Sequence, residues 1–499
     1  MAKRIQLDPL LEAERDERLA RITTRLGDYE PLSATLAWID TLRAIEEFIN
    51  LQTVDWPPGF EATLYGMPVA GIAFDPGPLR EVIPHLHHRF GQNFVARFTR
   101  LVTQLASVAI AFAGQGVHEV VTELASVGST IGFLQSRRRH FVAMLYALPI
   151  VCSGTVRFDP LNTLNDILPP IEFEGTALVF LENQIMMDAA RKALGAAGVL
   201  PEDDLAMLDD LFLEPERLRI TEAEVADHKA LEERLEPVAA DRIFSAAELR
   251  NDLVATEESY REFDLDSTAF PPVAALIRRL SREFIDKDFW IRIDPPGFDR
   301  LCDEHGLSPA ARRAMVAPTG DYFQCLASHA ALVLVAGTYL STVTLLSRFA
   351  YYWRDRSLAK VKRYQIRSGF LFEKAVTAAI VEQGFEPTGE KRIEKQEFDV
   401  LARRDGILWN IQCKNNISDL SRLAAEPLLF ARYNKGLVRS YARALAKEEG
   451  REQLLRTRFG DVEVRHLVVS RMPVVGGEAR VVPFSRVGGL ADYADRLAS

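Results

Sequence analysis

Cysteine is scarce in this sequence, with four residues in 499, and no two of them are close enough to form a Cys-x-x-Cys pair. A small disulfide-bonded or zinc-bound scaffold is therefore excluded. The first twenty residues lack the apolar core of a secretory signal, so we expect a cytoplasmic protein. The sequence contains neither a Gly-x-x-x-x-Gly-Lys-Ser/Thr loop nor a Gly-x-Ser-x-Gly elbow, so we expect no nucleotide-binding loop in this chain and no serine nucleophile of that type.

Positive charge is also in deficit, since 60 Lys and Arg face 70 Asp and Glu, but it is unevenly distributed. Residues 351–460 hold 22 basic against 14 acidic residues, a net charge of +8, whereas the remainder has a net charge of −18. The acidic average argues against nucleic-acid binding over the whole surface. From the length we expect more than one core: a mainly helical region over 1–350, a basic linker over 351–363 and a further domain over 364–499.

Apolar spacing and capping residues indicate helices in the first region. Two hydroxyl residues precede apolar residues spaced as i, i+4, i+7 and i+11, which predicts a capped helix with one apolar stripe. The set consists of Ser33 and Thr35, followed by Trp38, Leu42, Ile45 and Ile49. Ser245 and Glu248 have the spacing of a second capped start. Residues 57–78 and 169–181 carry Pro and Gly between short apolar runs, so we expect loops or short strands there.

One stretch, residues 322–347, has 26 residues without Asp, Glu, Lys or Arg. Arginines follow it, so its length and flank fit a membrane span. Several polar residues lie inside it, and each would cost free energy in hydrocarbon unless paired. We therefore expect a helix buried in the helical core, and keep a membrane anchor as the alternative.

Residues 369–385 form the first of two segments that carry chemistry. Four apolar residues share one helical face at about 100° per residue. These are Phe372, Val376, Ala379 and Ile380. Glu373 lies at the edge of that face, so a carboxylate is held where the helix packs. Gly384 is a natural helix stop, and Phe385 begins extended chain.

The second segment, residues 394–416, contains two alternating runs joined by Asp405 and Gly406. An Asp-Gly pair between such runs predicts a hairpin with a two-residue loop. Residues that face each other across this hairpin have numbers that sum to 811, which makes the predicted register open to disproof.

That register places four polar side chains together. Asp399 faces Gln412 and Glu397 faces Lys414, and residues two apart on a strand share a face. The opposite face is expected to be apolar and to pack on a helix. Its members are Phe398, Val400, Ile411 and Cys413.

Such a set suits metal-dependent phosphodiester hydrolysis. Carboxylates and a backbone carbonyl are hard oxygen ligands for Mg²⁺, and waters fill the remaining positions. We expect Asp399, Glu373 and the carbonyl of Cys413 to be the protein ligands. The metal lowers the pKa of a water and offsets phosphate charge, while the ammonium of Lys414 orients that water or stabilises developing charge.

The order of these residues resembles the PD-(D/E)xK nuclease superfamily, which has the restriction-endonuclease-like fold. The matching residues are Gly369, Phe372 and Glu373, then Gly384 and Phe385, then Glu397 to Val400, then Gln412, Cys413 and Lys414. The Gln-x-Lys form is similar to that of Mrr-type restriction endonucleases. The resemblance covers about 110 residues, from Tyr364 to Ser470.

The resemblance implies a C-terminal α/β domain with a central mixed sheet flanked by helices. It also implies Mg²⁺-dependent cleavage of DNA, with Mn²⁺ as a substitute, in restriction or in defence against foreign DNA. Gln412 stands where the commonest pattern has an acid, which removes one charged metal ligand. A catalytically silent domain that binds nucleic acid or protein is therefore the alternative. A homo-oligomer or a partner subunit stays open.

Downstream of the hairpin, four cationic residues at spacings of three, four and four would form one stripe on a helix. They are Arg432, Lys435, Arg439 and Arg443. Such a stripe could contact DNA phosphates, and a solvated helix face is the alternative. Residues 462–470 read as a further strand of the sheet, in which we expect His466 to be structural.

Overall fold

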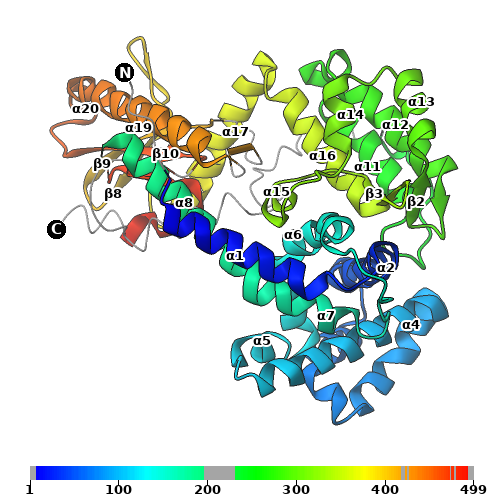
Figure 1. Cartoon of the computed structure of the whole chain (residues 1–499). Helices are drawn as coiled ribbons and strands as arrows, with labels where there is room; N and C mark the ends of the chain where they lie inside the picture. The colour runs from blue at the N-terminus through cyan, green and yellow to red at the C-terminus, as the bar shows by residue number, and fades with distance from the viewer. Residues whose placement is uncertain are drawn as a thin grey trace. The chain divides into compact units, whose positions relative to one another are not determined.

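The computed structural model describes residues 7–195, 231–416, 422–423, 426–472, 474–476 and 479–492 (Figure 1). The chain divides into two compact units. The helical unit comprises Arg15–Val179 and Ala226–Arg354, and the sheet unit comprises Met1–Glu14, Phe180–Val225 and Asp355–Ser499. The division between Arg354 and Asp355 falls inside the predicted linker, but the sheet unit also takes in residues from the first half of the chain. Most of that linker is helical, since a helix continues to Leu358.

Most of the described helices lie wholly or partly in the helical unit. They are α1 (Pro9–Leu26), α2 (Pro31–Ile49), α3 (Pro58–Gly66), α4 (Gly77–Gly114), α5 (His118–Glu123), α6 (Val127–Val151), α7 (Thr163–Pro170), α8 (Thr176–Leu194), α11 (Ala246–Ser259), α12 (Phe270–Glu283), α13 (Pro295–Glu304), α14 (Pro309–Met315), α15 (Tyr322–Leu326) and α16 (Val343–Leu358). Three of them, α1, α8 and α16, contain a point at which the chain passes from one unit to the other.

Two predicted helices of this unit are confirmed. The first is α2, and its whole predicted stripe is buried. It begins at Pro31 rather than after Ser33, because proline suits the first turn, where no backbone N–H is needed. The second is α11, where the Ser245 hydroxyl accepts a hydrogen bond from Glu248 N at 3.2 Å and the Glu248 carboxylate accepts one from Ser245 N.

The prediction of loops or strands at two Pro- and Gly-rich segments is confirmed only for short loops at 67–69 and 74–76 in the first segment and is wrong for the second. In the first segment, Pro58 occupies the first turn of α3 and a 3₁₀ turn follows at Ala70–Ala73. In the second, α7 continues through a π-helical turn, Ile171–Gly175, directly into α8. The wider turn lets the helical path continue past two prolines, which cannot donate backbone hydrogen bonds.

Residues 322–347 form neither a membrane helix nor a single buried helix. They contain α15, then strands β3 (Val333–Val335) and β4 (Thr338–Thr342), then the start of α16. Ala336 and Gly337 turn the chain with φ of 46° and 76°, and the β-branched residues on both sides favour strands. These strands join β1 (Ile285–Asp286) and β2 (Trp290–Ile293) in an antiparallel sheet of order β1-β2-β4-β3.

The sheet unit is built on a five-stranded mixed sheet of order β11-β10-β9-β8-β5. Its elements are α17 (Lys362–Val381), β5 (Glu386–Pro387), β6 (Arg392–Ile393), β7 (Gln396–Glu397), β8 (Val400–Arg404), β9 (Ile407–Lys414), α19 (Pro427–Glu449), α20 (Glu452–Phe459), β10 (Val464–Ser470) and β11 (Val481–Pro483). β5, β8 and β9 pair antiparallel, whereas β9, β10 and β11 pair parallel. Strands β6 and β7 form a separate small hairpin.

Helices cover both faces of this sheet (Figure 1). On one face, Phe372 and Val376 of α17 pack against Val400, Trp409 and other apolar residues of the strands. On the other face, Leu455 of α20 packs with residues of β8, β9 and β10, and α19 lies across β10 and β9. The expected mixed sheet flanked by helices is therefore present in the C-terminal part of the chain.

Among the described helices, α4 alone is long and apolar enough to cross a membrane, and half of its apolar window is buried inside the structure. Burial of this kind is also typical of a core helix, so the feature is weak evidence for a membrane span. The helical backbone of α4 is interrupted at Gly91, where φ is 77° and the helix kinks.

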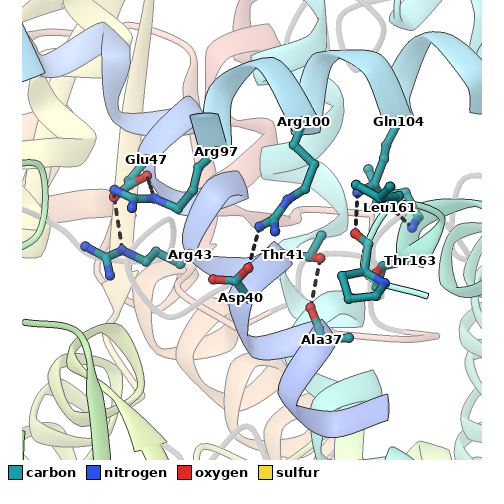
Figure 2. A network of polar contacts seen from close by, with 12 residues as sticks. Ala37, Asp40, Thr41, Arg43, Glu47, Arg97, Arg100, Gln104, Leu161 and Thr163 are labelled. Atoms are coloured by element: carbon teal, nitrogen blue, oxygen red, sulfur yellow. Dashed lines mark hydrogen bonds and ion pairs between the residues drawn. The ribbon is translucent and has the colours of Figure 1, made fainter. Parts of the chain in front are cut away.

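Ion pairs join α4 to α2 within the helical unit (Figure 2). Both oxygens of Glu47 accept bonds of 2.7 Å from Arg97, and Glu47 also pairs with Arg43 at 3.2 Å. Asp40, two turns before Glu47 on α2, pairs with Arg100 of α4. Glu47 is buried, and burial lowers the pKa of Arg43. Because water does not fully hydrate these charges, each depends on its ion-pair partners for stabilisation.

Replacement of Glu47 by Ala should lower the free energy of unfolding of the helical unit by about 2–4 kcal/mol, because it leaves two arginines without their carboxylate. Hydrogen exchange of the α2 and α4 amides measures this loss. The control is Glu283→Ala, which removes a solvent-exposed pair with Arg279 and should leave exchange unchanged. Equal effects of the two substitutions would contradict the prediction.

Candidate functional site

The predicted hairpin register is confirmed. Arg404 pairs with Ile407 and Val400 pairs with Ile411, as numbers that sum to 811 require. The loop residues Asp405 and Gly406 have φ of 52° and 77°, which is the pattern of a type I′ turn. The turn therefore sets the register of β8 and β9, and with it the residue of β9 that lies beside Asp399.

Asp399 lies directly before β8 and is held by donors from β9. Its Oδ2 atom accepts a hydrogen bond of 2.7 Å from Nε2 of Gln412 and another of 2.7 Å from the backbone N–H of Cys413. The predicted neighbours Asp399 and Gln412 are thus in contact. No described residue hydrogen-bonds Oδ1, so that oxygen is available to a ligand.

The extension of the register to Glu397 and Lys414 is wrong. Glu397 belongs to β7 and pairs with Arg392, whereas Lys414 pairs with Ser470 of β10. The chain bends at Asp399, so the alternation of faces breaks there. For the same reason Phe398 packs on the α20 face, opposite to the prediction. The other three members of the predicted apolar face, Val400, Ile411 and Cys413, do pack on the α17 side.

Glu373 projects from α17 near the bend at Asp399. Burial, the main cause, and the charges of Asp399 and Glu397 raise its pKa, although an ion pair with Lys391 opposes them. The Lys391 ammonium donates to Oε2 of Glu373 at 2.7 Å. Within the described chain Oε1 of Glu373 has no hydrogen-bond partner. Two carboxylates on different elements therefore each keep one oxygen free.

Lys414 completes the polar side of this end of β9. Burial lowers the pKa of its half-buried ammonium, and Lys447 acts in the same direction, while Asp399 and Glu448 oppose both. No hydrogen bond or ion pair of the ammonium is present among the described residues. Its three donors are thus available to an anionic ligand.

Cys413 contributes its backbone rather than its thiol. The side chain packs against the apolar core under α17, and burial raises the pKa of the thiol well above its ordinary value. The thiol is therefore a neutral apolar group at neutral pH. The role of the Cys413 carbonyl as a metal ligand stays a prediction.

Hydrogen bonds hold the residues that follow β9 to the covering helices. Asn415 donates to the Ser368 hydroxyl of α17 at 2.7 Å, and Asn416 donates to the Tyr441 hydroxyl of α19 at 2.6 Å. Further back, buried Asn410 contacts Glu448 and His466, each at 3.1 Å. His466 has the structural role that was expected for it.

The cationic stripe on α19 is only partly available. Arg432, Arg439 and Arg443 are exposed, whereas the ammonium of Lys435 donates to the carbonyl of Ala193 at the end of α8. Beside that contact, Ala193 packs on Ala431. Lys435 therefore secures α8 to α19, which the sequence pattern did not indicate.

Lys391 was missed by the sequence analysis. It precedes the segment from residue 394 in which the hairpin was predicted, and no spacing rule links it to Glu373. The structure inserts the β6–β7 hairpin between β5 and β8, and this hairpin brings Lys391 to the carboxylates.

The donor set fits a hard divalent cation in part. Carboxylate oxygens with a free lone pair are the ligands that Mg²⁺ prefers, and water completes its shell. The described part of the chain contains no group of three or more His, Cys, Asp or Glu side chains placed to hold a metal. Among the described residues the site thus supplies two carboxylates, and the expected third protein ligand is the backbone carbonyl of Cys413.

Comparisons with known proteins identify no relative: no family model matches the chain, and neither a curated protein nor a solved structure gives a match. The chemistry of the site therefore has to be argued from its geometry.

Replacement of Glu373 by Gln should stabilise the sheet unit at pH 7. A raised pKa means that folding disfavours the charged carboxylate above that pKa, and the cost disappears as the pH falls and both states become protonated. The gain should therefore shrink at pH 4. Hydrogen exchange of β8 and β9 amides at both pH values, corrected for intrinsic rates, measures it.

The matched control is Glu386→Gln on the exposed strand β5, which should change nothing at either pH. A loss of stability in Glu373→Gln at pH 7 would show that the pair with Lys391 outweighs burial.

Proposed function

We propose that this chain is a metal-dependent endonuclease that hydrolyses phosphodiester bonds of DNA, with its site in the sheet unit. The observation that carries the proposal is the position of Asp399, whose carboxylate is held by Gln412 and the Cys413 N–H beside Glu373 and Lys414. One helix and two successive strands thus bring two acids, an amide and a lysine to one end of a mixed sheet.

The order of elements supports the finer assignment to a restriction-endonuclease-like fold. A helix that carries the first acid, α17, precedes the antiparallel strands β5, β8 and β9, and α19 then leads to the parallel strand β10. This is the arrangement of helices around a mixed sheet that the resemblance to the PD-(D/E)xK superfamily implies. The family assignment is part of the proposal.

Gln412 has an orienting role in this proposal. Its amide donates to Oδ2 of Asp399, so it directs Oδ1 away from β9 and needs no charge to do so. A donor that fixes a ligating carboxylate is the usual way in which proteins set metal geometry. The neutral residue at this position is therefore compatible with activity.

Glu373 and Asp399 would hold Mg²⁺, or Mn²⁺ in its place, with the carbonyl of Cys413 as the expected third protein ligand. When bound, the metal supplies an acidified water and neutralises charge on the phosphate. Lys414 would bind a phosphate oxygen and stabilise the charge that develops there. Its half-buried setting strengthens that interaction relative to one in water.

The exposed arginines of α19 are candidates for contacts with DNA phosphates. Arg432, Arg439 and Arg443 keep their charges in solvent, where they would add affinity without sequence preference and make binding weaken with salt. A role in restriction or in defence against foreign DNA rests on the resemblance alone.

Purified protein should nick plasmid DNA with Mg²⁺ or Mn²⁺ and stop when a chelator is added. Asp399→Ala should abolish cleavage, because the metal then loses the carboxylate that Gln412 and the Cys413 N–H hold in place. Lys414→Met should lower the rate at least about 100-fold, since one stabilising donor is lost. The matched control is Lys362→Met, an exposed lysine at the start of α17, which should retain activity.

Cleavage that persists in chelator, or in both site variants, would contradict the proposal. A folded protein that binds DNA but neither cleaves it nor binds Mn²⁺ would favour the alternative, a silent binding module.

A further inference from the structure

Lys391 is held in place by the β6–β7 hairpin that emerges between β5 and β8. The carbonyl of Lys391 accepts a hydrogen bond of 3.0 Å from the N–H of Phe398, so its backbone is tied to the residue before Asp399. The neighbouring Glu390 forms an ion pair with Arg458 of α20. Burial of Ile393 in the core beneath α20 anchors the hairpin from its other face.

The side chain of Lys391 reaches back to Glu373. Its ammonium lies 2.7 Å from Oε2, and the two residues are exposed to very different degrees, 64 % for Lys391 against 16 % for Glu373. The carboxylate is thus enclosed, while the lysine stem extends through solvent. A flexible four-carbon stem in solvent can leave the carboxylate at little cost.

An ammonium and a divalent cation compete for the same carboxylate. Both bind through the lone pairs of its oxygens, and an ammonium that stays close repels a second cation. Lys414 of β9 has no hydrogen bond or ion pair with Glu373, and Glu373 is not among the groups that act on its pKa. Lys391 is the cation that the hairpin delivers to Glu373.

We infer that Lys391 is a tethered counter-ion that competes with the divalent metal for Glu373 and so sets the metal concentration at which the site loads. This inference rests on the proposed function, in which Glu373 is a metal ligand. At low metal concentration Lys391 neutralises the enclosed carboxylate. At higher concentration the metal displaces its ammonium into solvent.

Titration of the purified protein with Mn²⁺ and with Mg²⁺ by isothermal calorimetry tests the inference without measuring activity. Lys391→Met keeps the length of the side chain and removes its charge, so it should bind both metals about two- to tenfold more tightly than the unmodified chain. Lys391→Arg keeps the charge and should bind within about twofold of it.

The control is Lys395→Met, an exposed lysine in the turn of the same hairpin, which should leave affinity unchanged. Equal or weaker binding by Lys391→Met overturns the inference while the proposed function stands. An equal gain in Lys391→Met and Lys395→Met also overturns it, because general charge rather than competition is then responsible. Absence of metal binding in every protein overturns both the inference and the metal site of the proposed function.

Discussion

The two-residue turn at Asp405 and Gly406 is the constraint on which the arrangement of the site depends. A loop one residue longer would move every side chain of β9 to the other face of the sheet. Gln412 would then point into the apolar core under α17, and Cys413 would face the polar side. With the observed turn, the amide of Gln412 meets the carboxylate of Asp399 instead.

One face of β9 packs into the apolar core under α17, and the opposite face carries polar contacts. Ile411 and Cys413 pack under α17, while buried Asn410 on the opposite face binds Glu448 of α19 and His466 of β10. Asn410, Glu448 and His466 are all buried and are hydrogen-bonded to one another through Asn410, so this contact holds α19 to the sheet. That support extends to the end of the strand, where the polar side chains of the site lie.

Burial favours the uncharged form of two titratable groups of the site, Glu373 and Lys414. It raises the pKa of Glu373 and lowers that of Lys414, so both neutral forms are favoured relative to water. A divalent cation beside the first group and a phosphate beside the second would restore both charged forms. The electrostatics of the site therefore support the proposed chemistry, since each ligand would favour the charged form of a group that burial disfavours.

Short-range patterns were sufficient to predict part of this structure. The hairpin register, the helix that carries Glu373, the strand at residues 464–470 and the helix after Pro31 all follow from turn residues and apolar periodicity within about twenty residues. The contact between Asp399 and Gln412 follows from the same local information, whereas the mixed sheet flanked by helices was an implication of the family resemblance. The family resemblance added the order of the acidic and basic residues, but no contact.

The remaining features of the structure depend on contacts between residues that are far apart in the sequence. Lys391 reaches Glu373 because a small hairpin is inserted before β8, the bend at Asp399 sends Phe398 to the other face, and α8 joins the sheet unit through Ala193 and Lys435. The apolar stretch at 322–347 became a hairpin and two helices because partner strands from residues 285–293 were available to it. Local sequence determined the register that brings Asp399 to Gln412, and only tertiary packing decided that Glu373 of α17 and the cations stand beside them.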